Sequence, residues 1–163
     1  MAKHGIPDDF KSLAMAESGL SPDVVSSAGA AGLWQIMSAT GKSYGLSVGG
    51  GVDERYDIEK STEVACKYLL ASYRRFGSWT LAAAAYNAGD AGVQRRMAKQ
   101  GTSSYYDSFY PEETMRYVFR ILSFKIVLSD PGLYGYAVAP GGYYLPLTVY
   151  LTVPVHAAKI DWL

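Results

Sequence analysis

The sequence predicts a mainly α-helical domain with a short extended or β-stranded tail at its C-terminus. Apolar side chains recur at helical spacing in successive windows, and residues typical of helix starts and stops separate these windows. The segment 143–155 differs, because it is rich in Tyr, Val, Leu and Thr and is interrupted by Pro146 and Pro154. Such a composition is typical of edge strands or of an extended strap.

The first predicted helix begins near Pro7, where a fixed φ suits the first helical position, and ends at Gly19. A second helix is expected over residues 30–44. The run of glycines at 49–51 predicts a flexible loop.

Four further helices are expected beyond that loop. Asp57 and Ser78 stand where side chains cap helix N-termini, and Gly101 and Gly132 stand where helices end. The predicted spans are 58–76, 79–88, a short basic helix ending at residue 100, and 112–128. The polar, tyrosine-rich segment 102–110 between the last two is expected to be an irregular loop.

Composition narrows the classes of function. The 163 residues carry 15 Lys or Arg and 15 Asp or Glu, so the formal net charge is zero, which argues against strong binding to nucleic acid or an anionic membrane. No apolar run is long enough to span a bilayer, and no signal peptide is recognised. The 14 tyrosines and three tryptophans suit either a sugar-binding groove or a core.

No metal or other cofactor is expected. His4 and His156 are far apart in sequence and have no Cys or His partner at ligand spacing. Cys66 is the lone cysteine, so it cannot form an internal disulfide, and its apolar neighbours predict a buried thiol.

Glu17 is the most unusual residue of the first helix. Phe10, Leu13 and Ala14 form an apolar stripe, and Glu17 takes the next place on that face. A carboxyl group against apolar surface should have a raised pKa, as a general acid working near neutral pH requires. The same position also allows an ordinary helix end at Gly19, with Glu17 pointing to water.

Four segments carry a resemblance to a known family. They are Glu17-Ser18 with Gly32-Leu33-Trp34-Gln35, then Val52-Asp53-Glu54-Arg55-Tyr56-Asp57, then Ala85-Tyr86-Asn87-Ala88-Gly89, then Glu113-Thr114-Met115-Arg116-Tyr117-Val118. In this order they resemble the lysozyme-like lytic transglycosylases (SLT domain, glycoside hydrolase family 23), and within it the membrane-bound lytic murein transglycosylase D branch. The resemblance covers about residues 5–136. It implies a goose-type lysozyme-like fold, and we expect a catalytic domain over 1–136. The composition beyond it predicts an extended strap over 137–163 that packs on the same domain.

The resemblance implies a reaction as well. Glu17 would be the sole acid and base in cleavage of the β-1,4 bond between N-acetylmuramic acid and N-acetylglucosamine in peptidoglycan, and the product would carry a 1,6-anhydro ring. Residues matching the family's substrate-binding positions are Ser26, Gln35, Met37, Tyr86, Asn87, Glu113 and Tyr117. Tyr86 matches a tyrosine whose hydroxyl lies beside the glutamate. Without the family, Ser26 is read as a loop or capping serine, Asn87 as part of a helix end and Glu113 as a helix cap.

Two other functions stay open. A goose-type lysozyme would share the fold and the glutamate but deliver water to C1, which requires a second carboxylate; Asp53, Asp57 and Glu113 are the candidates. A non-catalytic peptidoglycan-binding domain would keep the groove for recognition alone. In each case the expected partner is a peptidoglycan glycan strand. We expect a monomer that works in the periplasm or cell envelope, with any export signal or anchor outside this chain.

Overall fold

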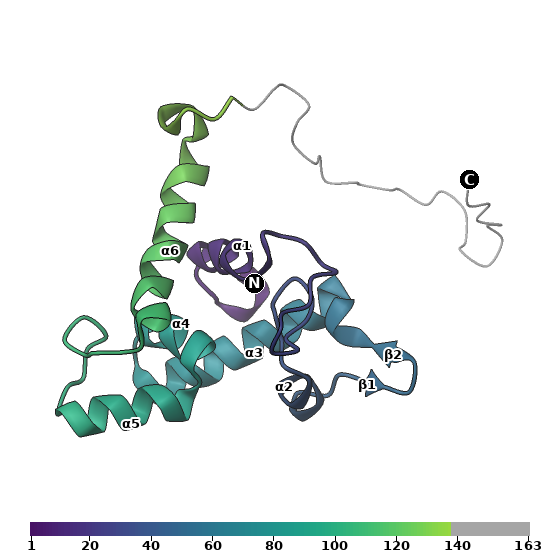
Figure 1. The fold of residues 1–163 in the computed structure, drawn as a ribbon, viewed down its shortest axis with the longest axis horizontal. Coiled ribbons are helices and arrows are strands. Elements are labelled where there is room, and N and C mark those ends of the chain that lie inside the picture. The colour runs from purple at the N-terminus through teal and green to yellow at the C-terminus, as the bar shows by residue number, and fades with distance from the viewer. Residues whose placement is uncertain (138–163) are drawn as a thin grey trace. The chain divides into compact units, whose positions relative to one another are not determined.

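The computed structural model describes residues 1–137, which fall into a compact unit over Met1–Ser129 and a second unit that starts at Asp130. The first unit contains all six α-helices of the described residues and one small hairpin (Figure 1). The mainly helical class predicted from the sequence is confirmed.

Helix α1 (Lys11–Ser18) follows two single 3₁₀ turns, Ala2–His4 and Asp8–Phe10. It ends where predicted, because Gly19 adopts φ 63° and donates its N–H to the Met15 carbonyl at 3.0 Å. Its apolar stripe is buried, and Leu13 is fully shielded from solvent.

The prediction of a single helix over residues 30–44 is wrong. Only α2 (Ser38–Ser43) is helical, and the chain before it forms a tight loop with isolated bridges between Val25 and Ala31 and between Ala31 and Ile36. Left-handed backbone at Gly32 (φ 80°) and Gln35 (φ 46°) interrupts any helix.

The predicted flexible loop over residues 49–51 is a hairpin turn instead. Strands β1 (Val48–Gly49) and β2 (Val52–Asp53) pair antiparallel around Gly50 and Gly51. Both of these glycines have positive φ, as the tightest two-residue hairpin turns require.

Helices α3 (Ile58–Phe76) and α4 (Trp79–Ala88) form the central pair of the first unit. Their predicted caps are present: the Asp57 carboxylate accepts from the Lys60 N–H at 2.9 Å, and the Ser78 hydroxyl accepts from the Leu81 N–H at 3.4 Å. The alanine run at the centre of α4 is buried, which lets α3 approach closely.

Helices α5 (Asp90–Gln100) and α6 (Glu112–Ser129) also match the predicted spans. The loop between them is irregular, as expected, and is held by the Tyr105 hydroxyl, which donates to the carbonyls of Thr114 at 2.9 Å and Met115 at 2.7 Å. Helix α6 packs against both α1 and α4. It therefore brings its own side chains to the end of α1, where Glu17 lies.

The second unit begins with a 3₁₀ turn, Pro131–Tyr134, which the Asp130 carboxylate caps through the Leu133 N–H. The predicted edge strands or strap at 143–155 lie outside the described residues, and so does nearly all of the predicted 137–163 segment. Within the described part of the chain, no helix combines the length and apolar character needed to cross a bilayer.

Candidate active site

Glu17 lies on the last turn of α1 and is partly buried where α1 packs against α6. Burial raises the pKa of its carboxyl group above the usual value of 4.5. A hydrogen bond from Tyr117 and the positive charge of Arg120 oppose this rise, and the negative charge of Glu113 adds to it. The raised pKa predicted from the apolar stripe is therefore found.

The hydroxyl of Tyr117, on α6, donates a hydrogen bond to Glu17 Oε1. Burial and the negative charge of Glu17 hold the pKa of Tyr117 well above its usual value, so the phenol stays protonated and acts as a donor. Tyr117 therefore contacts the carboxylate directly.

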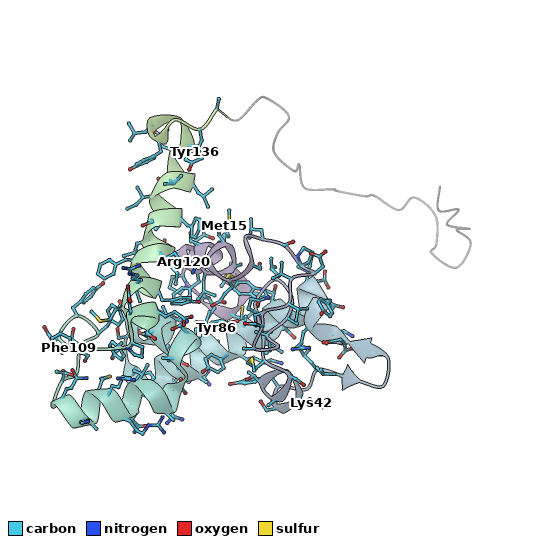
Figure 2. All side chains as sticks on the ribbon, viewed as in Figure 1. Met15, Lys42, Tyr86, Phe109, Arg120 and Tyr136 are labelled. Atoms are coloured by element: carbon cyan, nitrogen blue, oxygen red, sulfur yellow. The ribbon has the colours of Figure 1, made fainter. Side chains whose placement is uncertain are left out.

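Tyr86 lies near Glu17 without bonding to it. Its hydroxyl donates to the Trp34 carbonyl at 2.8 Å, so the phenol bonded to Glu17 is Tyr117. Burial and the nearby charge of Glu17 raise the pKa of Tyr86 well above its usual value, which places the ring close to the carboxylate. Figure 2 shows Tyr86 near the middle of the first unit.

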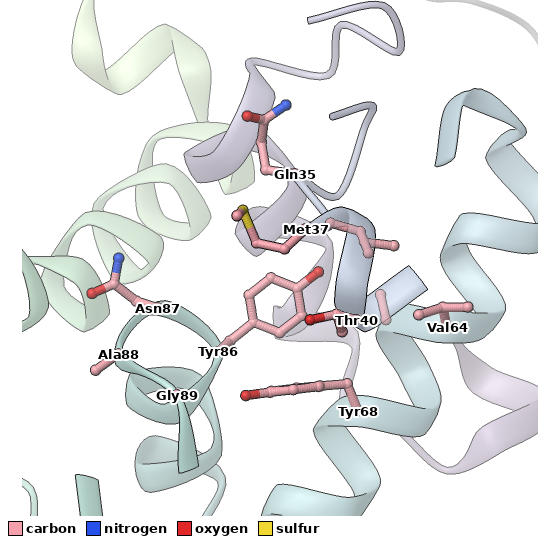
Figure 3. Close-up of a pocket in the computed structure, with 11 residues that line it drawn as sticks. Gln35, Met37, Thr40, Val64, Tyr68, Tyr86, Asn87, Ala88 and Gly89 are labelled. Atoms are coloured by element: carbon pink, nitrogen blue, oxygen red, sulfur yellow. The ribbon is translucent and has the colours of Figure 1, made fainter. Parts of the chain in front are cut away.

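A cavity of about 290 Å³ opens beside Tyr86. Four of the predicted substrate-binding residues line it together, although they come from separate segments: Gln35, Met37, Tyr86 and Asn87. Figure 3 shows Met37 above the Tyr86 ring and Tyr68 below it, with the side chain of Asn87 turned outward. Aromatic faces beside amide groups suit a sugar, which offers apolar C–H faces and polar hydroxyl edges.

The loop before α2 forms one wall of this cavity, and its conformation depends on Gln35. Gln35 Nε2 donates to the carbonyls of Val24 at 3.0 Å and Gly32 at 2.9 Å, so its amide holds these two parts of the loop together. The Ser18 hydroxyl donates to the Leu33 carbonyl at 2.8 Å, which joins the loop to the residue after Glu17. Glu17 and the cavity wall are thus positioned together.

Ser26 closes its own turn. Its hydroxyl accepts from the Ala30 N–H at 3.0 Å, and its backbone N–H donates to the Ala30 carbonyl at 2.9 Å. These bonds match the capping role that Ser26 has when read without the family. No hydrogen bond joins Ser26 to Glu17 within residues 1–137.

Asn87 and Glu113 are joined across α4 and α6. Asn87 Nδ2 donates to Glu113 Oε1 at 3.0 Å, and the buried Thr114 hydroxyl donates to Asn87 Oδ1 at 2.8 Å. Both the amide orientation and the carboxylate position are therefore fixed by partners. Asp53 and Asp57, the other candidates for a second carboxylate, instead pair with Arg55 and cap α3.

Arg55 is a structural residue that the sequence did not single out. It is 8% exposed, and its Nη1 donates to the carbonyls of Gly29 at 2.8 Å and Ile36 at 3.0 Å, which hold both ends of the cavity loop. Its counter-ion Asp53 is 2.7 Å away. A signal existed: Asp53 and Arg55 are two residues apart and both belong to the second family segment.

Tyr68, on α3, also lines the cavity. Its hydroxyl donates to the Ala85 carbonyl at 3.1 Å, and burial raises its pKa to about 12. No cluster of three His, Cys, Asp or Glu side chains gathers as metal ligands within the described residues.

The comparisons with known proteins agree with this arrangement. Residues 2–109 match the family described as transglycosylase SLT domain. The membrane-bound lytic murein transglycosylase D of Escherichia coli (strain K12) is 32% identical over 164 residues, which cover 97% of this chain and 36% of the relative. The chain thus spans about a third of the length of the curated relative that it matches.

Solved structures show the same fold. The 70 kDa soluble lytic transglycosylase of Escherichia coli matches with a TM-score of 0.64 and 28% identity, over 73% of this chain and 21% of that one. An inactive mutant of lytic transglycosylase Slt from Pseudomonas aeruginosa matches in fold with a TM-score of 0.66 and 23% identity, over 83% of this chain and 23% of that one. The lysozyme-like fold is therefore confirmed, and the chain belongs to the transglycosylase SLT domain family.

Proposed function

We propose that this chain is the catalytic domain of a peptidoglycan lytic transglycosylase, with Glu17 as its single acid and base. The observation that carries the proposal is the environment of Glu17: burial raises its pKa, and Tyr117 donates a hydrogen bond to it. A sugar-sized cavity opens at Tyr86, whose own pKa is raised in part by the nearby charge of Glu17. A raised pKa increases the protonated fraction of a carboxyl group at a given pH, and the protonated form can donate a proton to a leaving group.

The reaction begins when Glu17 protonates the glycosidic oxygen between N-acetylmuramic acid and N-acetylglucosamine. As the C1–O bond breaks, the acetamido carbonyl of the muramic acid stabilises the positive charge at C1. The tyrosine hydroxyl of Tyr117, bonded to Oε1, stabilises the carboxylate that this step leaves behind.

Glu17 then removes the proton from the C6 hydroxyl of the same muramic acid, and the oxygen closes onto C1. The product has a 1,6-anhydro ring, no water is consumed, and Glu17 is protonated again. Gln35, Met37, Tyr86 and Asn87 support the binding of the glycan, because all four line the cavity. The names of the relatives, which include a membrane-bound murein enzyme, support action at the cell envelope.

A hydrolytic reaction is the second candidate. Glu113 is near enough for its negative charge to raise the pKa of Glu17, and a second carboxylate near the acid can activate a water. Glu113 is joined to Asn87, however, and that amide already occupies one of its oxygens. A lytic transglycosylase needs no second carboxylate, so Glu113 would contribute to binding alone.

Mass spectrometry of muropeptides released from purified peptidoglycan tests the proposal. The unmodified chain should release products that are one water lighter at the muramic acid end. Glu17→Gln should bind peptidoglycan but release at least a hundredfold less product, and Glu113→Gln should still form anhydro ends. Reducing ends that disappear in Glu113→Gln would indicate a lysozyme, and binding without any release by the unmodified chain would indicate a recognition domain.

A further inference from the structure

A second cavity, of about 540 Å³, adjoins the sugar-sized cavity and shares Asn87 and Ala88 with it. Its remaining walls come from α5 and from the first turn of α6. Because the two cavities meet at Asn87, one extended ligand can occupy both.

Three cationic side chains line this second cavity: Arg95, Arg96 and Lys99. They are exposed, and their spacing on α5 places Lys99 one turn beyond the two arginines. None of the three belongs to a salt bridge within residues 1–137. We name this feature the basic cavity.

One carboxylate also faces the basic cavity. Glu113 lines it, and Asn87 Nδ2 holds Glu113 Oε1 at 3.0 Å. Three cations against one carboxylate still leave an excess of positive charge. This local excess contrasts with the zero formal charge of the whole chain.

We propose that the basic cavity binds the free carboxylates of the peptide attached to the muramic acid of the substrate. This inference rests on the proposed function. The glycan backbone of that substrate is uncharged, whereas the peptide that branches from the muramic acid carries carboxylates. Arginine guanidinium groups bind carboxylates through paired N–H donors, and the lysine adds a point charge.

The position of the basic cavity suits a group that branches from a glycan bound in the first cavity. A glycan in the first cavity would reach Asn87, and a peptide leaving the sugar there would enter between α5 and α6. A long polyanion such as nucleic acid fits less well, because Glu113 lies in the same cavity and the chain as a whole offers no positive field.

Binding measurements in the Glu17→Gln chain test the inference without cleavage of the ligand. Three soluble glycan strands of equal length are compared: one with complete peptides, one with the peptides removed, and one with the peptide carboxylates amidated. The expected result is about tenfold tighter binding of the complete strand than of the other two, and a smaller difference at high salt.

Substitution of all three cations, as Arg95→Gln, Arg96→Gln and Lys99→Gln together, should lower this ratio to about one. The matched control is Arg74→Gln on α3, an exposed arginine with no salt bridge in the described part of the chain; it should keep the ratio. An unchanged ratio in the triple variant, equal binding of all three strands by the parent, or no binding of any strand would each overturn the inference.

Failure of the proposed function would be seen elsewhere, in the cleavage assay of the chain with Glu17 intact. If the chain releases anhydro products but binds all three strands equally, the proposed function stands and the role of the basic cavity is refuted. If it shows the carboxylate-dependent ratio but releases nothing, the role of the basic cavity stands and the proposed function is refuted.

Discussion

Tyr117 and Glu17 are 100 residues apart in the sequence, and the hydroxyl of the first donates a hydrogen bond to the carboxylate of the second. The contact exists because α6 packs against α1. It opposes the effect of burial on the same carboxyl group, since a donor to the ionised form lowers its pKa whereas burial raises it.

Tyr117→Phe should therefore move the pH dependence of cleavage. Without the hydrogen bond the pKa of Glu17 rises further, and because the first step needs protonated Glu17, the alkaline limb of the kcat/KM profile moves to higher pH. The maximal rate should fall about three- to tenfold, the size of one hydrogen bond. Tyr86→Phe is the control, because the Tyr86 hydroxyl donates to Trp34 and its loss should leave the limb in place. An unmoved limb in Tyr117→Phe would contradict the role given to this bond.

Glu17→Gln should be more stable than the unmodified chain at neutral pH. The folded-state pKa of Glu17 is raised, so its ionisation opposes folding, and the unmodified chain loses stability as the pH rises from about 4.5 through the folded-state value. Glutamine carries no charge and escapes this loss. Urea unfolding at pH 7 and at pH 4 measures the effect. The two chains should differ at pH 7 and converge at pH 4, and a variant that is less stable at both pH values would refute the prediction.

Gly32→Ala should destabilise the cavity loop strongly. A Cβ atom at Gly32 would lie 2.2 Å from the Arg55 carbonyl oxygen, and the backbone there has φ 80°. Gly29 has a similar φ of 84°, but nothing lies within 4 Å of its Cβ position. Gly29→Ala therefore measures the free-energy cost of a positive φ without a steric clash. We expect about 1 kcal/mol for Gly29→Ala and about 3 kcal/mol or more for Gly32→Ala. Equal losses in thermal or urea unfolding would show that the close approach does not matter.

Asp53→Asn should remove the counter-ion of a buried arginine. Arg55 holds the pKa of Asp53 below its usual value through a side-chain hydrogen bond, so the ion pair stabilises the fold above about pH 4 and its effect is lost as the pH falls through the lowered pKa. We expect a loss of about 2 kcal/mol at pH 7, below that of a fully buried pair because the Asp53 side chain is 25% exposed.

The measurement is urea unfolding at pH 7 and at low pH, where the difference from the unmodified chain should shrink. Asp9→Asn is the matched control, because Asp9 pairs with Lys125 at the exposed surface and should change stability little. A loss that is constant with pH would show that Asp53 acts through packing and not through its charge.

Most helices were predictable from the sequence because their signals are local. Asp57 and Ser78 cap the helices that follow them, and Gly19 and Gly101 end helices in the left-handed conformation, all through bonds within a few residues. The loop at 30–37 could not be predicted in this way. Its helical pattern was overridden by the distant Arg55, which bonds to the Ile36 carbonyl inside this loop and to the Gly29 carbonyl just before it.

The sequence by itself determined the helical class, the anomalous place of Glu17 on an apolar stripe, and the family. Periodicity and short motifs are properties of neighbouring residues, so they can be recognised without knowledge of the tertiary structure. The tertiary structure decided which tyrosine bonds to Glu17, how the cavity walls meet, and that three cations of α5 share a cavity with Asn87. These relationships depend on helix packing between distant segments, and no local pattern of residues encodes the distances that such packing creates.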